Sequence, residues 1–290
     1  MLTLISDTDC DMTPSLAKEF GYKVIIPMPY AIDGKLYHPY VESEDYDHKS
    51  FYAKLRTGTL PTTSAVSESV YIKYFEPEFA AGNDILYVHF SSGMSNTFEN
   101  MDKAVETLKK KYPERKFYSI DTLGISAESL NIAMEVGDMY KAGKTAEEIV
   151  EWSKTEVSKF PLYFIADDLK FFRRSGRVSG LAATMGNFIG IRPIIYVNEE
   201  GKMVSIGKEV GRNKAIDRLV QYVEELGEDV KSHRITIGHA DCQDLVDIIT
   251  AKLKEKFGDD LKIVVTMVNP TIGSHCGPNG MGVCFHGKHR

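Results

Sequence analysis

The sequence predicts an α/β protein in two parts, an N-terminal parallel-sheet α/β domain at residues 1–160 and a C-terminal α+β domain at residues 161–290. In the first part, short apolar runs alternate with amphipathic stretches, as in βαβ units around a parallel sheet. After about Phe160 the pattern changes to an antiparallel strand pair followed by helices and further strands. Because no flexible linker separates the halves, we expect a ligand in the cleft between them.

The N-terminal elements follow from apolar runs and helix caps. Ser67 is positioned to begin one helix, and Ser95 or Thr97 to begin another. Thr145 and Glu148 have the spacing of a capping box before a third helix. Apolar runs predict four strands, at residues 2–5, 85–90, 117–120 and 162–166.

Turn residues predict two hairpins. Asp33 and Gly34, between two short apolar runs, indicate a tight hairpin outside the main sheet. A second turn at residues 198–201 joins strands at 194–197 and 203–206. The C-terminal domain is completed by two helices and two strands, at residues 214–226, 245–257, 235–238 and 263–268.

One segment of the second half, residues 178–191, contains no charged residue. Its large apolar residues recur at helical spacing, which is typical of a buried helix or of one wall of an apolar pocket. These residues are Leu181, Met185, Phe188 and Ile189.

Composition and charge exclude several classes of protein. The net charge of -6 argues against a general nucleic-acid-binding protein, which needs a basic face toward phosphates. No apolar run approaches the roughly 20 residues of a membrane span, and the first residues lack the pattern of a signal peptide. We therefore expect a cytoplasmic protein without a stable membrane anchor. The four cysteines form no CxxC pair, so reduced thiols are expected.

Two hydroxyl-rich loops are candidates for binding an anion. Residues 85–97 predict a strand, a turn containing Ser92 and Ser95, and the start of a helix, where unpaired N–H groups favour an anion. Thr63 and Ser64 lie in a second such turn that also precedes a helix. Hydroxyls can donate hydrogen bonds to a carboxylate or a phosphate. The alternative for both loops is that these side chains only cap helices.

Two enzyme classes remain as alternatives. Asp7 and Asp9, just after a strand, resemble the paired aspartates of magnesium-dependent haloacid-dehalogenase-type phosphatases. The sequence around Ser95 comes within one residue of the G-x-S-x-G elbow of serine hydrolases, with His239 or His275 as the possible base. The second glycine of that elbow is missing.

The C-terminal segment 271–282 is dense in glycine and contains His275. We expect it to follow a strand without opening a helix, with its backbone lying against a ligand. The late histidines and cysteines do not match the spacing of a standard zinc site, so neither a metal nor a cofactor is expected. Basic residues cluster at 169–177 and 211–214, where they could meet a phosphorylated ligand or an acidic partner.

Taken in order, several of these segments resemble the DegV family of bacterial fatty-acid-binding proteins. Each segment is weak alone, and their order and spacing along nearly the whole chain make the resemblance specific. The matching segments are residues 5–8, 62–64, 90–97, 120–122, 175–179 and 273–278.

The resemblance implies that the chain binds a long-chain fatty acid such as palmitate between its domains. It implies that Thr63 and Ser95 hold the carboxylate, with His275 close by and Ser64 and Ser92 in the same loops. Members studied as B subunits of fatty acid kinase present the fatty acid to a separate ATP-dependent kinase subunit that forms an acyl phosphate. The resemblance implies the same role here, with no catalysis by the carrier alone. Basic positions near the head group or the kinase contact correspond to Arg177 and Arg212.

The sequence departs from the family pattern at two places. The hydroxyl loop often reads T-S-Q-P-S in the family, whereas Ala65 and Val66 stand here in place of the amide and the proline. A glycine pair usually precedes the arginine of the basic motif, and Ser175 replaces the first glycine of that pair. The change in the hydroxyl loop affects the head-group geometry or the choice of partner. The change at Ser175 affects the role assigned to Arg177.

Overall fold

A parallel four-stranded sheet forms the centre of the first half in the computed structural model, which describes residues 1–41, 43, 45–181 and 190–290. The strand order is β2-β1-β6-β7, and all pairs are parallel. The strands are β1 (Leu2–Asp7), β2 (Tyr22–Ile26), β6 (Asp84–His89) and β7 (Phe117–Asp121). Parallel strands end at the same edge, so the loops after β1 and β6 lie side by side.

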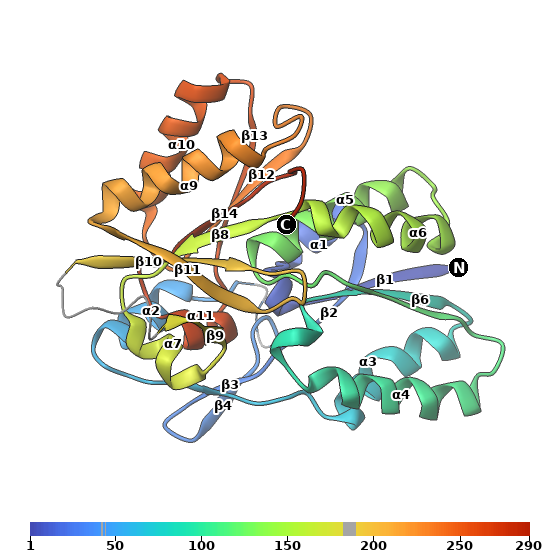
Figure 1. Cartoon of the computed structure of the whole chain (residues 1–290). Coiled ribbons are helices and arrows are strands. Elements are labelled where there is room, and N and C mark those ends of the chain that lie inside the picture. The colour runs from blue at the N-terminus through green and yellow to red at the C-terminus, as the bar shows by residue number, and fades with distance from the viewer. Residues whose placement is uncertain (42, 44, 182–189) are drawn as a thin grey trace.

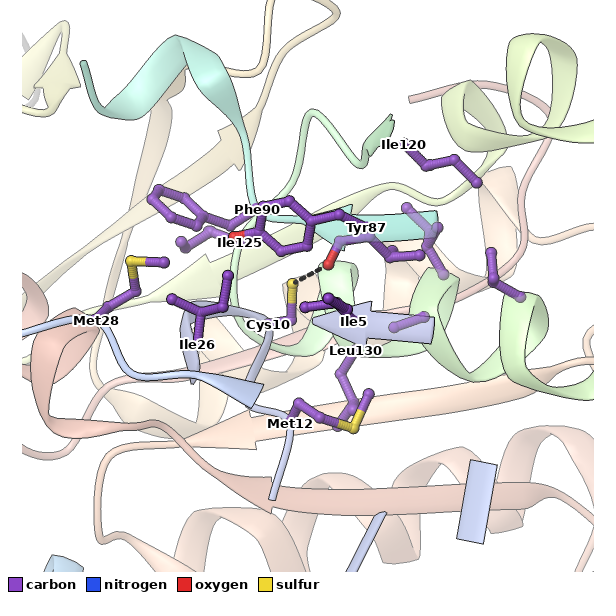
Figure 2. Packing of buried hydrophobic residues seen from close by; sticks show 14 of the residues in the cluster. Ile5, Cys10, Met12, Ile26, Met28, Tyr87, Phe90, Ile120, Ile125 and Leu130 are labelled. Atoms are coloured by element: carbon purple, nitrogen blue, oxygen red, sulfur yellow. Dashed lines mark hydrogen bonds between the residues drawn. The ribbon is translucent and has the colours of Figure 1, made fainter. Parts of the chain in front are cut away.

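Helices cover both faces of this sheet (Figure 1). On one face lie α3 (Glu68–Ala80) and α4 (Thr97–Lys111), and on the other lie α1 (Pro14–Phe20), α5 (Ala127–Lys141) and α6 (Ala146–Glu156). Their inward apolar stripes form the main core with the strands. Figure 2 shows part of this core around Cys10, whose Sγ lies 3.9 Å from the Val88 carbonyl oxygen.

A mixed seven-stranded sheet forms the second half, in the order β13-β12-β14-β8-β10-β11-β9. Its strands are β8 (Leu162–Ile165), β9 (Val178–Ser179), β10 (Ile191–Val197), β11 (Met203–Val210), β12 (Arg234–His239), β13 (Lys262–Met267) and β14 (Met281–Cys284). One face packs on α9 (Arg212–Leu226) and α10 (Gln243–Phe257). The other face contacts α5, which is therefore buried between the two sheets.

A smaller group of elements closes one side of the space between the sheets. It contains a three-stranded sheet of β3 (Tyr30–Ile32), β4 (Lys35–Tyr37) and β5 (Thr62–Thr63). Three helices, α2 (His48–Arg56), α7 (Leu169–Ser175) and α11 (Pro270–Cys276), complete this group. Short 3-10 turns follow three elements: η1 (Thr8–Cys10), η2 (Ser92–Met94) and η3 (Val157–Lys159).

Most predicted elements are confirmed. The parallel sheet, the hairpin at Asp33, the β10–β11 pair and the helices α9 and α10 all form, and Thr145 and Glu148 make the predicted capping box. Ser67 is the N-cap position of α3, although its side chain makes no capping hydrogen bond. The fourth predicted strand, β8, joins the second sheet and pairs antiparallel with β10 and β14.

The prediction that residues 271–282 open no helix is wrong. Pro270 is the first residue of α11, and the Asn269 side chain accepts hydrogen bonds from the Thr271 and Ile272 N–H groups. This Asn-Pro pair is a strong helix start, which the density of glycines obscured.

Strands β2 and β14 are among the elements that the sequence does not predict. Position 282, inside β14, requires a glycine, because a Cβ there would come within 2.8 Å of the Phe164 Cβ on the neighbouring strand. The predicted helix at residues 178–191 falls largely on residues 182–189, which lie outside the described residues. At its ends, Val178 belongs to β9 and Ile191 begins β10.

Candidate ligand-binding site

A cavity of about 330 Å³ lies between the two sheets. Its volume is at the lower end of the range for small-molecule sites. Most of the lining side chains are apolar and come from both halves, among them Met28, Phe90, Ile125, Phe164, Phe172, Met203 and Val268. Figure 2 shows Met28, Phe90 and Ile125 together on the side of the N-terminal sheet. Polar lining residues come partly from the two loops predicted to bind an anion and partly from other segments: Thr63, Ser64, Ser95, Asn96 and Thr97 lie in the loops, and Asp9, Ser126, Arg177, Thr271 and His275 lie elsewhere.

The first of these loops brings Thr63 to the cavity. Thr63 ends β5 and pairs with Tyr30 of β3, and its Oγ1 lies 2.9 Å from Nε2 of His275. His275 is in the last turn of α11, so this hydrogen bond joins segments from opposite ends of the chain. Ser64 also lines the cavity and is exposed. The structure thus brings Thr63, Ser64 and His275 together at one place.

The second loop contributes Ser95, which lies between η2 and α4 and lines the same cavity. Its Oγ accepts a hydrogen bond of 3.3 Å from the N–H of Thr97, the first residue of α4. The N-cap position of this helix is Asn96, so Ser95 bonds to the start of the helix without being its N-cap. The two roles are compatible, because a hydroxyl that accepts one bond can still donate another.

Thr97 holds the two loops together. Its side chain is buried, and Oγ1 accepts a 3.0 Å hydrogen bond from the Val66 N–H. Asn100, one turn later in α4, donates a 2.9 Å hydrogen bond to the Val66 carbonyl oxygen. Nothing in the sequence indicates this positioning role, because Thr97 there is only a candidate helix cap.

The His275 imidazole is neutral near neutral pH. Burial lowers its pKa to about 4, and the nearby Arg177 and Arg174 guanidinium groups act in the same direction. A neutral ring with one nitrogen facing Thr63 can fix the direction in which the Thr63 hydroxyl points. The positive charges beside it favour an anion at this end of the cavity.

Arg177 lines the cavity, whereas Arg212 and Ser92 do not. Arg212 begins α9 and forms an ion pair with Asp167, with an N–O distance of 2.7 Å. Ser92 is exposed, and its backbone N–H lies within 3.4 Å of the Asp121 carboxylate oxygens. Of the two arginines proposed for the head group, only Arg177 is placed to face a ligand in this cavity.

A turn from the second sheet fastens the Ser95 loop from outside. The Ser91 hydroxyl donates a 2.7 Å hydrogen bond to the Gly201 carbonyl oxygen in the β10–β11 turn. At Gly93 a Cβ would come within 2.5 Å of the Glu200 carbonyl oxygen, so only glycine permits this approach. The loop that carries Ser95 is therefore held by both halves of the molecule.

The aspartates after β1 are buried. Asp7 has no exposed surface, and its carboxylate accepts hydrogen bonds from the Tyr87 hydroxyl and from the N–H groups of Asp9, Cys10 and Phe90. Burial raises the pKa of Asp7 to about 7. Asp7 is not part of the cavity lining, whereas Asp9 is.

Metal-ligating side chains are not clustered in the described ranges. Within them, no group of three or more His, Cys, Asp or Glu side chains is placed to hold a metal ion. No helix in the part of the chain that the structure describes has both the length and the apolar character to cross a bilayer.

Comparison with known proteins identifies the family. A family model described as "Uncharacterised protein, DegV family" matches residues 1–288. The chain belongs to the DegV family. A DegV domain-containing protein of Clostridium perfringens is 31% identical over 284 residues, which cover 98% of this chain and 97% of that protein.

Solved DegV structures share the whole fold. A fatty acid binding DegV family protein from Streptococcus agalactiae is 27% identical, with a TM-score of 0.82 and coverage of 100% of this chain and 99% of that chain. A protein from Eubacterium ventriosum described as binding stearic acid has a TM-score of 0.87 at 17% identity and 99% coverage of both chains. The DegV resemblance and the predicted fold class are thereby confirmed.

Proposed function

We propose that this DegV-family chain binds a long-chain fatty acid in the cavity between its sheets. The observation that carries the proposal is the division of the cavity into a polar and an apolar part. Thr63, Ser95 and His275 provide hydrogen-bonding groups at one end, and apolar side chains from both sheets form most of the remaining wall. The fatty-acid-binding relative from Streptococcus agalactiae supports the same ligand class.

The energetics suit a lipid carrier. Burial of an acyl chain of about 16 carbons is worth on the order of 10 kcal/mol before association costs. The hydroxyls then set the orientation of the carboxylate and add a smaller share of the affinity. Thr63 and Ser95 are half-buried, and Ser64 and Arg177 are exposed, so the carboxylate would lie near the surface with the chain inside.

The exposed carboxylate supports the second part of the proposal. The protein presents its fatty acid, in the cytoplasm, to a separate ATP-dependent fatty acid kinase subunit, which forms the acyl phosphate. The chain itself is a carrier without catalysis of its own. Arg177 at the cavity is the residue that we propose to meet the head group, and Arg212 remains a candidate for the kinase contact.

The proposal is tested with delipidated protein. Calorimetric titration with palmitate should give one site per chain, and adding a fatty acid kinase subunit with ATP should then yield acyl phosphate. If palmitate binds but no such subunit transfers phosphate from ATP to it, the carrier function stands and the kinase partnership is excluded. The phosphatase alternative at Asp7 and Asp9 is favoured by no observation, because Asp7 is fully buried and its carboxylate is occupied by protein donors.

A further inference from the structure

Asp9 is a polar residue in the cavity wall that binding of a simple fatty acid does not explain. It belongs to η1, is 6% exposed and lines the cavity. Its Oδ1 is buried and has no hydrogen-bond partner among the described residues. A buried carboxyl oxygen without a partner costs free energy, so an unbranched hydrocarbon chain would leave that cost uncompensated.

The surroundings of the Asp9 carboxyl favour its protonated form. Burial raises its pKa well above the ordinary value, the neighbouring Asp7 and Asp11 carboxylates add to the shift, and the Asn269 amide offsets part of it. A protonated carboxyl has one O–H donor as well as acceptor oxygens. The Asp9 carboxyl therefore suits a ligand group that can both accept and donate a hydrogen bond, such as a hydroxyl.

The position of Asp9 along the cavity follows from α11. Asn269, at the start of this helix, bonds to the Thr8 carbonyl oxygen and the Asp11 carboxylate, on either side of Asp9 in the chain. His275, at the other end, bonds to Thr63. Between them the helix advances about 9 Å, at roughly 1.5 Å per residue.

The same helix lies along the cavity. Thr271, Ile272, His275 and Cys276 all line it, and their spacing puts them on one face of α11. If the ligand carboxylate lies at Thr63 and His275, Asp9 therefore faces the acyl chain at a point about 9 Å from that carboxylate, measured along α11. This is several carbon–carbon bonds of about 1.5 Å from the carboxyl carbon.

We propose that Asp9 is a specificity-determining residue that selects fatty acids carrying a hydroxyl group near the middle of the chain. The inference rests on the proposed function. The Asp9 side chain supplies the hydrogen-bond partner that the hydroxyl loses on leaving water, and the hydroxyl supplies the partner that Asp9 lacks. An unsubstituted chain of the same length enters the cavity but leaves the Asp9 Oδ1 atom without a hydrogen-bond partner.

The test compares three ligands by competition on delipidated protein. They are stearic acid, a hydroxystearic acid with its hydroxyl near the middle of the chain, and an isomer with its hydroxyl beside the carboxyl carbon. The wild-type protein should bind the mid-chain isomer about tenfold more tightly than stearic acid, the change that one hydrogen bond to a buried group gives. The isomer with its hydroxyl beside the carboxyl carbon should show no such preference.

Two variants separate specificity from structure. Asp9→Asn keeps hydrogen-bonding atoms and should retain the preference, while Asp9→Leu should reverse it. Thermal unfolding of ligand-free Asp9→Leu should occur at the same or a higher temperature than that of the wild type, because a buried carboxyl without its full set of partners has been removed. An unchanged ligand ratio in Asp9→Leu would overturn the inference while leaving fatty acid binding intact. If the wild type bound none of the three ligands, the proposed function would be overturned as well.

Discussion

Single side chains at one end of the cavity are the groups that we propose to bind the carboxylate, and Thr63 is held there by a hydrogen bond to His275. Its hydroxyl is fixed by the neutral His275 ring at 2.9 Å. Thr62, the neighbouring residue of β5, is exposed and does not line the cavity, since successive residues of a strand point to opposite sides. The two threonines therefore form a matched pair for mutation.

We expect Thr63→Val to weaken palmitate binding roughly 10- to 100-fold, because a hydrogen bond to a charged group is worth about 1.5–3 kcal/mol. Thr62→Val should leave the dissociation constant unchanged. Calorimetric titration of the two variants measures both. Equal affinities for the two variants would remove Thr63 from the site.

A second single residue, Arg290, fastens the C-terminal segment to the first half. Its guanidinium donates to the carbonyl oxygens of Thr122, Leu123 and Val157 and pairs with Glu128 at 3.0 Å. Both side chains of the pair are almost completely buried. Removal of one partner would leave an uncompensated buried group on the other.

At about pH 9, where Glu128 is mostly ionised, Arg290→Ala should therefore lower the free energy of unfolding by about 3–5 kcal/mol, the usual cost of breaking a buried pair. Lys288→Ala, at an exposed position two residues earlier, is the control and should change stability little. Urea denaturation compares them. A variant at Arg290 as stable as the wild type would show that the buried pair contributes nothing.

At the scale of elements, the turn after β1 and the start of α5 gather buried carboxyl groups with raised pKa values. Burial raises the pKa of Asp7 to about 7 and that of Glu128 to about 8. A carboxyl whose folded-state pKa is raised contributes stability that is complete below its ordinary pKa and is lost progressively as pH rises to and through the folded-state value.

Stability should consequently fall, by on the order of 1 kcal/mol, between about pH 7 and about pH 9. The buried histidines do not oppose this trend, because a histidine with a lowered pKa is already neutral in both states in that range. Urea denaturation at the two pH values measures the fall, and Asp7→Asn should reduce its slope whatever its own stability. A rise in stability over this range would contradict the assignment of these groups.

The turn between β10 and β11 is the element that positions the Ser95 loop from the second sheet. At Gly93 a methyl group would come within 2.5 Å of the Glu200 carbonyl oxygen, so the turn and the loop would have to separate. A methyl group at Gly207 in β11 would meet no atom within 4 Å, and Gly207 is not among the glycines with positive φ. Gly207 is therefore a suitable control.

Gly93→Ala is expected to cost about 1–3 kcal/mol of stability, as overpacking usually does, and to weaken palmitate binding. Gly207→Ala should affect neither the melting temperature nor the affinity by a comparable amount. If Gly93→Ala binds palmitate as the wild type does, the contact between the β10–β11 turn and the loop is not needed for the site.

At the scale of the whole molecule, local patterns predicted much of the architecture. Alternating apolar runs and helix caps are short-range signals, so the parallel sheet, the hairpin at Asp33 and the helices α9 and α10 could be predicted. Strand β14 could not, because its glycine, Gly282, is explained by the close approach of β8. The helix α11 was missed although its Asn-Pro start is a local signal.

The site was predictable only in part for the same reason. Thr63, Ser95 and His275 lie far apart in the sequence, and their expected meeting came from the family resemblance. The position of Thr97 between the two loops, the distance of Arg212 from the cavity and the buried Asp9 in its wall depend on how the two sheets pack. No short-range pattern contains that information.

The central claim is that the cavity between the sheets holds a long-chain fatty acid. Mass spectrometry of a solvent extract from purified protein tests it most directly, with a Thr63→Val preparation extracted in parallel. We predict about one fatty acid per wild-type chain and clearly less in the variant. An extract without fatty acid, from a protein that also fails to bind added palmitate, would contradict the account.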